Sequence, residues 1–404
     1  MIKRNQNLAK LQAGYLFPEI NRRKNKVIMD NPGAKIISLG IGNTTEPLTP
    51  YIVESLKEAS VAMGTAQGYS GYGDEQGMAQ LREAVAENFY NGRVDPEEVF
   101  ISDGSKCDIA RLQVLFGADV TVAVQNPAYP VYVDGSVIMG AAGGYNTQTG
   151  QFDNIVYMDC KPENNFFPDL DNIPEADIIY FCSPNNPTGA TATKEQLKKL
   201  VDFAMRNGSL IVFDGAYSEF IRNPDLPRSI MEIEGAEEVA IEVNSFSKPA
   251  GFTGVRLGWS VVPNALKYED GSSVNKDWNR IMTTLFNGAS NIVQKGGLAA
   301  VSSQGRKEMK TLINYYMNNA GLIKSTLEEL GIKTYGGTDA PYIWAHFPGE
   351  DSWDKFTYIL EQAFVVTTPG AGFGSAGQGF IRFSAFGHRE NIEEACQRLK
   401  RVLQ

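Results

Sequence analysis

Short apolar runs alternate with segments of helical periodicity through the middle of the chain. The runs are typical of buried strands and lie at residues 99–101, 120–124, 178–182, 210–213 and 239–243. Helical segments separate some of them, as at residues 194–206. Near-continuous apolar strands alternating with helices indicate an α/β fold with a mostly parallel sheet covered by helices on both faces.

Two amphipathic helices are predicted ahead of the first of these strands. Thr49 and Pro50 favour a helix start, with Thr49 as the cap and Pro50 as the first helical residue. Proline is tolerated there because the backbone N–H that it lacks would have no partner within the helix. The second helix is marked by the helical spacing of the apolar residues Met78, Leu81, Val85 and Phe89.

The pattern differs at both ends of the chain. A long helical segment at 307–330 precedes strands at 342–347 and 380–384 and a closing helix at 391–403. The first 45 residues contain a strand at 36–39 and do not fit the central alternation. We therefore expect a large domain at 46–299 and a smaller α+β domain made of 1–45 and 300–404. The seam beside the carboxyl ends of the strands is the expected ligand cleft.

Composition narrows the class of protein. The chain has 404 residues, of which 43% are hydrophobic and 21% charged, as in ordinary soluble globular proteins. A net charge of -10 argues against nucleic acid or an anionic membrane as the main partner. No segment reaches the ~18 to 20 consecutive apolar residues of a membrane span. The polar residues 1–10 lack the apolar run of a secretory signal, so we expect a cytoplasmic location, or an organelle stroma if a targeting peptide was removed.

Cysteine and histidine usage makes a metal site improbable. The four cysteines show no CxxC pair and are interpreted as buried thiols of a reducing compartment. Two histidines, His346 and His388, are too few for most histidine-based metal centres. We expect no metal in the site.

The segment 245–258 carries the most specific chemistry. Ser245, Ser247 and Arg256 offer hydroxyls and a guanidinium suited to a phosphate, and they surround Lys248. A desolvated lysine can act as a neutral amine nucleophile, so the combination suits a Schiff base with pyridoxal phosphate. A solvated lysine and arginine in a glycine-rich loop is the alternative.

Two further strand ends carry groups that suit the same cofactor. Ser105 and Lys106 begin a predicted helix whose N-terminal N–H groups can bind an anion, although Ser105 also suits a helix cap. Asp214 follows a buried strand and needs a cationic partner such as a pyridinium N–H. Tyr217 can donate to a ring oxygen. A capping aspartate beside a core tyrosine is the alternative.

Two proline-rich turns also follow strands. Residues 183–189 hold Asn186, whose amide can bond an oxygen of a planar ligand. Residues 126–130 hold Tyr129, which offers an aromatic face for stacking. Plain turns explain both segments almost as well.

Taken together, the chain resembles the class I/II aminotransferases of the fold type I pyridoxal phosphate family. The resemblance covers nearly the whole length, and four separate motifs occur in the family's order. They are residues 71–77 (Gly-Tyr-Gly-Asp-Glu-Gln-Gly), 102–108, 183–189 and 245–258. The resemblance implies pyridoxal 5'-phosphate as cofactor, small amino acid and 2-oxo acid substrates, and a homodimer with shared active sites.

The resemblance also implies roles for the cofactor residues. Lys248 bonds the cofactor and then acts as the base, Asp214 pairs with the ring nitrogen, and Tyr129 stacks on the ring. Asn186 and Tyr217 bond the ring oxygen. The phosphate ligands implied are Ser105, Lys106, Ser245, Ser247 and Arg256, with Tyr72 from the neighbouring subunit.

Within the family, the longer strings imply transamination between LL-2,6-diaminopimelate and 2-oxoglutarate. Arg382 matches the arginine that grips the substrate α-carboxylate, and Glu75 is implied as the partner of the distal ammonium. Asn287 stands where aspartate-specific relatives have an arginine. The other implied substrate residues are Tyr15, Gly42, Lys106, Tyr129 and Asn186.

Three alternatives stay open at this stage. An aminotransferase for aromatic or aliphatic amino acids and a carbon–sulfur lyase of the same fold would both need the same cofactor pocket. A non-enzymatic regulator with this domain would carry an added DNA-binding helix pair, and we find no spare basic segment of that kind.

Overall fold

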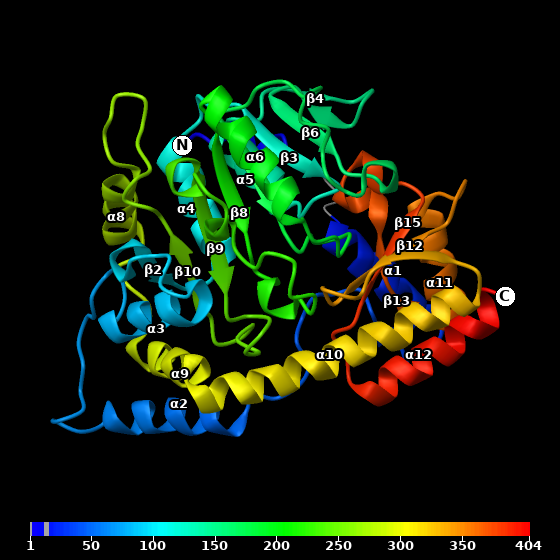
Figure 1. The fold of residues 1–404 in the computed structure, drawn as a ribbon. Helices are drawn as coiled ribbons and strands as arrows, with labels where there is room; N and C mark the ends of the chain where they lie inside the picture. The colour runs from blue at the N-terminus through cyan, green and yellow to red at the C-terminus, as the bar shows by residue number, and fades with distance from the viewer. Residues whose placement is uncertain (1, 12–15) are drawn as a thin grey trace.

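A seven-stranded sheet forms the centre of the larger part of the molecule in the computed structural model, which describes residues 2–11 and 16–404 (Figure 1). Its strand order is β2-β10-β9-β8-β7-β3-β6. The strands are β2 (Val99–Ser102), β3 (Val122–Asn126), β6 (Ile155–Asp159), β7 (Ile178–Cys182), β8 (Leu210–Asp214), β9 (Ala240–Ser245) and β10 (Gly258–Val261). A small hairpin of β4 (Tyr145–Asn146) and β5 (Gln151–Phe152) lies outside this sheet.

The sheet is mostly parallel, as the sequence predicts. Neighbouring strands from β9 to β6 pair in parallel, and only β10 runs antiparallel to both of its neighbours. The register places Cys182 beside Asp214 and Asp214 beside Val243. The carboxyl ends of β7, β8 and β9 therefore meet at one edge of the sheet, and this edge carries the chemistry described below.

Apolar side chains fill both faces of this sheet. Alternate residues of one strand enter different clusters, because successive strand side chains point to opposite faces. Tyr180 packs in a cluster with Ile109 and Trp278, whereas Ile179 and Phe181 pack with Leu197 and other residues of a second cluster. The predicted α/β class with a sheet covered on both sides is confirmed.

The helices of this part lie before, between and after the strands along the chain. They are α2 (Pro50–Ala62), α3 (Ala79–Tyr90), α4 (Ser105–Phe116), α5 (Val131–Met139), α6 (Lys194–Asn207), α7 (Ala236–Val239), α8 (Val274–Leu285) and α9 (Asn291–Val301). A third cluster, which includes Ile52, Leu81 and Ala300, joins α2, α3 and α9 beside the antiparallel edge of the sheet.

A second, smaller sheet lies on the right in Figure 1. It is antiparallel in the order β11-β12-β15-β14, and β1 pairs separately with β13. Its strands are β1 (Ile37–Ser38), β11 (Lys333–Gly336), β12 (Tyr342–His346), β13 (Val365–Val366), β14 (Thr368–Pro369) and β15 (Phe380–Ser384). Its helices are α1 (Leu16–Asp30), α10 (Ser303–Glu329), α11 (Ser352–Ala363) and α12 (Arg389–Val402). The long helix α10 runs along the molecule from α9 to α12 (Figure 1).

Differences from the predicted elements have local causes. Strand β7 and strand β15 agree with the predicted runs to the residue, since both are short, apolar and bounded by turns. Strands β6 and β10 and helix α1 are not predicted from the sequence; α1 has many charged residues and only a narrow apolar stripe. The domain boundaries at 45/46 and 299/300 stay a prediction.

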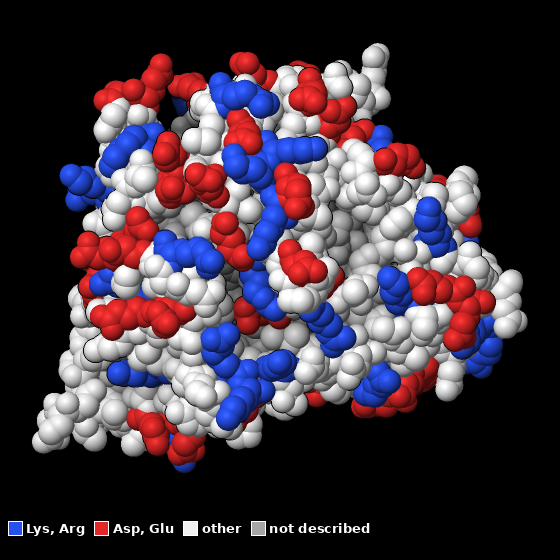
Figure 2. Space-filling view, viewed as in Figure 1, with Lys and Arg blue, Asp and Glu red and all other residues white. Residues whose placement is uncertain are grey.

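Charges of both signs are distributed over the molecular surface. Figure 2 shows acidic and basic side chains interspersed over the face seen in Figure 1. Among residues 2–11 and 16–404, no helix combines the length and the apolar character needed to cross a bilayer.

Candidate active site

A cavity of about 350 Å³ opens at the carboxyl edge of the large sheet. Strand ends of this sheet, strands of the small sheet and residues near the N-terminus all contribute to its wall. Twelve of the residues that the sequence predicts for the site line it, namely Gly42, Ser105, Lys106, Tyr129, Asn186, Asp214, Tyr217, Ser245, Ser247, Lys248, Arg256 and Arg382. The fold thus brings together residues from seven separate segments.

One end of the cavity is built to receive an anion. Ser245 ends β9, Ser247 follows it, and the Arg256 guanidinium lies 3.4 Å from the Ser247 hydroxyl. Helix α4 starts at this end with Ser105, so its N-terminal N–H groups add partial positive charge. Lys106 and Arg256 are both exposed and bring two full positive charges to the same place.

Glycine is required beside this anion-binding end. Gly104 has φ +124°, a conformation that other residues rarely adopt, and it is the residue before α4. A Cβ atom there would lie 2.7 Å from a guanidinium nitrogen of Arg256. The absence of a side chain therefore lets Arg256 lie directly against the start of the helix.

Lys248 lies in the interior of the cavity. Burial, followed by the positive charges of Arg382 and Arg256, lowers the pKa of its amine to about 8, while Asp214 opposes the shift. The ammonium donates to the carbonyl oxygen of Gly42. A lysine with this pKa has a substantial neutral fraction near neutral pH, which is the form that attacks a carbonyl carbon.

Asp214 is the acidic group of the cavity. It ends β8 and is buried, so desolvation raises its pKa, and the hydrogen bonds that it accepts act in the opposite direction. The Tyr132 hydroxyl donates to it at 2.8 Å and the Ala216 N–H at 3.1 Å. A buried carboxylate of this kind gains most from a nearby cation, such as a protonated ring nitrogen.

Arg382 is buried on β15, at 1% exposure, and faces the cavity from the small sheet. Its guanidinium donates to Asn186 at 2.6 Å and to the carbonyl oxygen of Gly40. It lies over the rings of Tyr342 and Phe373, at 4.5 and 4.8 Å from their centres. Burial lowers its pKa.

The hydrogen bonding of this guanidinium is incomplete. Among the residues that the structure describes, its Nε has no hydrogen-bond partner and no carboxylate contacts the guanidinium. A buried cation without an anion is costly, so the site suits a carboxylate brought in by a ligand. The tyrosine pair beside it, Tyr217 and Tyr342, shares a hydrogen bond of 2.7 Å between the two hydroxyls.

Several cavity residues were not identified from the sequence. Tyr132 holds Asp214, Tyr342 pairs with Tyr217, and Phe17 and Ile41 form apolar wall. Tyr132 lies three residues after Tyr129, at the start of α5, and this spacing was an available signal. Phe17 and Ile41 are apolar, so nothing in the local sequence distinguishes them from ordinary core residues.

Three of the predicted residues that the structure describes do not line this cavity, and a fourth, Tyr15, lies outside the described residues. Tyr72 is 92% exposed, and Glu75 and Asn287 are exposed as well. Glu75 and Asn287 nevertheless belong to adjoining loops: Gly288 packs so closely that a Cβ there would lie 3.4 Å from the Cα of Glu75. The chain thus presents these two residues together on its surface, away from its own cavity.

The groups in the cavity define a limited range of chemistry. An amine of lowered pKa can bond an aldehyde carbon, a buried carboxylate can pair with a heterocyclic N–H, and the anion-binding end can hold a phosphate. The Arg382 guanidinium, whose Nε has no partner among the described residues, can hold a carboxylate. These four functions lie in one cavity and fit a phosphorylated aromatic aldehyde together with an amino acid.

Comparison with known proteins agrees with this chemistry. The family model described as aminotransferase class I and II matches residues 34–399. LL-diaminopimelate aminotransferase of Protochlamydia amoebophila is 58% identical over 403 residues, covering 100% of this chain and 98% of that protein. The chloroplastic LL-diaminopimelate aminotransferase of Arabidopsis thaliana is 57% identical over 402 residues, covering 99% and 87%.

A solved structure gives the same result in three dimensions. The structure of L,L-diaminopimelate aminotransferase from Chlamydomonas reinhardtii superimposes with a TM-score of 0.96 at 60% identity. The match covers 100% of this chain and 99% of the other.

Proposed function

The chain belongs to the class I and II aminotransferase family and has its fold type I architecture, and on that basis we propose that it transfers an amino group between LL-2,6-diaminopimelate and 2-oxoglutarate. The products are tetrahydrodipicolinate and glutamate, in lysine biosynthesis. The observation that carries the proposal is the cavity in which Lys248, Asp214 and Arg382 meet. Identity of 57–58% along the whole chain to relatives named for this substrate supports it.

The proposed cofactor is pyridoxal 5'-phosphate. When bound, it supplies an aldehyde carbon that condenses with amines and a ring that accepts electrons. Ser105, Lys106, Ser245, Ser247 and Arg256 would hold its phosphate at the anion-binding end, and Tyr129 would stack on its ring. Gly104 supports this assignment, since a side chain there would meet Arg256.

Two residues of this chain would control protons during the reaction. The neutral amine of Lys248 would take the proton from the substrate α-carbon and deliver it to the carbon that was the cofactor's aldehyde, which its pKa of about 8 favours. Asp214 would hold a proton on the ring nitrogen, and its hydrogen bond from Tyr132 keeps the carboxylate oriented for this. Asn186 and Tyr217 would form hydrogen bonds with the oxygen on the cofactor ring.

Arg382 would bind the α-carboxylate of both substrates. Its unpaired Nε and its position between two aromatic rings support a two-point contact with a carboxylate, which a lysine makes poorly. The backbone at Gly42, whose carbonyl oxygen accepts a hydrogen bond from Lys248, would lie near the α-carboxylate end of the substrate.

The distal end of the substrate would be read by a second copy of the chain. Tyr72, Glu75 and Asn287 are exposed and do not line their own cavity, which supports their acting across a homodimer. Glu75 would pair with the distal ammonium, while Asn287, Lys106 and Tyr15 would bond the distal carboxylate. Light scattering tests the dimer: we expect twice the chain mass of 44.3 kDa, and a monomer would contradict it.

A coupled assay tests the substrate. The protein loaded with pyridoxal 5'-phosphate is offered LL- or meso-diaminopimelate with 2-oxoglutarate, and glutamate formation is followed. We expect turnover of the LL isomer and much slower turnover of the meso isomer. Turnover of aromatic or aliphatic amino acids alone would contradict the substrate, and release of pyruvate and ammonia would indicate a carbon–sulfur lyase. The expected cytoplasmic or stromal location stays a prediction.

A further inference from the structure

Helix α1 forms part of the substrate side of the cavity through its first turn. Phe17 lines the cavity, and its neighbour Leu16 is buried against the segment that follows β14. A Cβ on Gly372 would lie 2.2 Å from a methyl carbon of Leu16, so the helix and this segment are in close contact. Phe373, the next residue, is one of the two rings against Arg382. The position of α1 therefore affects the wall around Arg382.

Apolar packing holds one side of this helix. Leu16, Ile20 and Val27 are buried there. The hydrophobic effect is itself non-directional. A directional polar contact therefore adds to the packing in fixing the rotation of α1, and with it the place of Phe17 in the wall.

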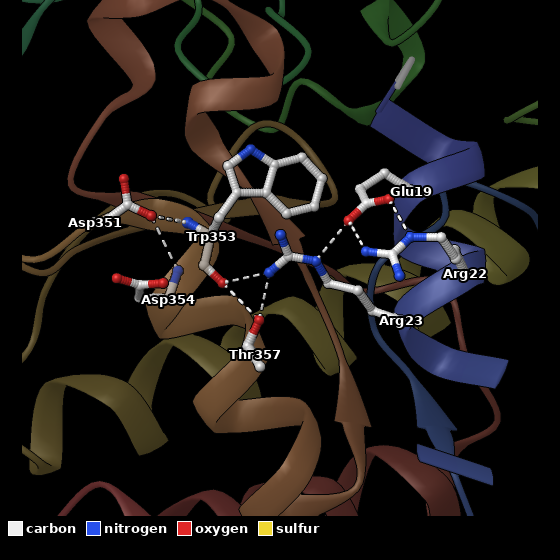
Figure 3. Close-up of polar contacts among 7 residues, drawn as sticks. All are labelled: Glu19, Arg22, Arg23, Asp351, Trp353, Asp354 and Thr357. Atoms are coloured by element: carbon white, nitrogen blue, oxygen red, sulfur yellow. Dashed lines mark hydrogen bonds and ion pairs between the residues drawn. The ribbon is translucent and has the colours of Figure 1, made fainter. Parts of the chain in front are cut away.

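Arg23 supplies a directional contact between α1 and α11 (Figure 3). Its Nε donates to Glu19 at 2.8 Å, one turn earlier on the same helix. Another guanidinium nitrogen donates to the Thr357 hydroxyl at 2.6 Å and to the carbonyl oxygen of Trp353 at 3.3 Å. The guanidinium also lies over the Trp353 ring, 4.7 Å from its centre. A planar group held from three sides tolerates little rotation.

Arg22 provides a natural comparison on the same helix. It donates to Glu19 with two nitrogens, each at 2.7 Å, and its side chain is 67% exposed (Figure 3). Within the described part of the chain, the hydrogen bonds of Arg22 stay inside α1, whereas those of Arg23 reach α11. The two arginines therefore share one carboxylate and one helix but differ in whether they connect α1 to the small sheet's helix.

We propose that Arg23 is a positioning residue for substrate binding: by holding α1 against α11 it sets the cavity wall at Phe17 and, through Leu16 and Gly372, the packing around Arg382. This inference rests on the proposed function. Substrate carboxylates would be bound less well without it, while the anion-binding end and Lys248, on the other sheet, would be unaffected. The expected signature is a rise in KM with little change in kcat.

Steady-state kinetics of the full chain loaded with pyridoxal 5'-phosphate test the proposal. Arg23→Met, which keeps apolar contact with Trp353, should raise KM for 2-oxoglutarate and for diaminopimelate roughly tenfold and change kcat less than about twofold. Arg22→Met should change both constants less than about twofold. Arg23→Lys should give an intermediate KM, because it keeps the charge but loses the planar fork. Equal KM values for Arg22→Met and Arg23→Met would overturn the proposal.

Hydrogen exchange separates this inference from the proposed function. Amides of residues 16–30 should exchange faster in Arg23→Met than in Arg22→Met, and Thr357→Val, which removes one acceptor only, should show a smaller increase in the same direction. An inactive wild-type protein would defeat the proposed function, yet the exchange comparison would still decide whether Arg23 holds α1. Unchanged exchange in Arg23→Met would overturn the inference even in an active enzyme.

Discussion

The cavity has two halves, and they are built in different ways. The half beside Lys248 takes its groups from neighbouring strand ends of a single sheet, so Asp214 and Ser245 are placed by the register of β8 and β9. The half beside Arg382 combines a strand of the small sheet, the first turn of α1 and the chain near Gly42. The positions of the groups in the first half are fixed by the large sheet alone. Those in the second half depend on how the small sheet, α1 and the chain near Gly42 pack together.

The two halves also differ in their charge balance. Near Lys248, the charges of Arg382 and Arg256 lower the pKa of its amine and the Asp214 carboxylate raises it, while Lys248 in turn lowers the pKa of Asp214. Around Arg382, described contacts come from neutral groups, and Nε has no partner. The amine and the carboxylate of the first half therefore come from a single chain, whereas Arg382 in the second half has no carboxylate among its described contacts and, in our proposal, is completed by a ligand and a second chain.

The largest expected effect comes from removing the amine. Lys248→Ala should lower kcat by at least about 10⁴-fold, because no other group combines a neutral amine with this position. Thermal unfolding should show a folded protein, since the side chain is not part of a hydrophobic cluster. Retained wild-type turnover in this variant would contradict the role of the first half.

The second largest effect is expected when the Asp214 carboxylate is replaced by a neutral amide. Asp214→Asn should lower kcat roughly 10²- to 10³-fold, because a neutral amide no longer stabilises a proton on the ring nitrogen. Asp177→Asn is the matched control: Asp177 precedes β7 and bonds Thr121 at the opposite edge of the sheet. Equal losses in the two variants would show that Asp214 acts through stability alone. Steady-state kinetics with thermal melts measure both.

A smaller effect, expected for one substrate and not the other, tests the half of the cavity beside Arg382. Glu75→Gln should raise KM for diaminopimelate roughly tenfold and leave that for glutamate within about twofold, since only diaminopimelate carries a distal ammonium. Glu83→Gln, at an exposed position on α3, is the control. An equal rise in KM for both substrates would show that Glu75 does not bind the distal ammonium. It would also remove one argument for a second chain at the cavity.

The smallest effect is the pH dependence of cofactor loading. The pKa of Lys248 is lowered to about 8, so its neutral fraction rises as pH rises through 8 and then levels off. The rate at which the apoprotein takes up pyridoxal 5'-phosphate should increase about fivefold between pH 7 and 8 and little above pH 9. An increase that continues to pH 10 would indicate an amine of ordinary pKa. Visible absorbance follows the reaction.

Sequence reasoning succeeded where strand ends define the chemistry. Lys248, Asp214 and Ser105 each follow a short apolar run, and parallel strands bring such ends to one edge. It identified Arg382 because a charge between apolar neighbours on a strand favours burial, and the side chain is 1% exposed. The α/β class and the mostly parallel sheet follow from the same alternation.

The parts that were missed depend on packing between distant segments. Phe17 and Ile41 become wall residues only because α1 and the chain before α2 fold back over the sheet edge. The link from Arg23 to Trp353 and Thr357 spans more than 300 residues of sequence, and no local pattern indicates it. Antiparallel β10 was also missed, because a strand that contains Gly258 and Ser260 lacks the continuous apolar signal.

Borohydride reduction of the loaded enzyme, followed by peptide mass spectrometry, tests the central claim most directly. Reduction fixes the cofactor to the lysine that bonds it, and two lysines, Lys106 and Lys248, line the cavity. The account predicts one stable adduct, on the peptide that contains Lys248. An adduct on Lys106, or no adduct on either, would contradict it.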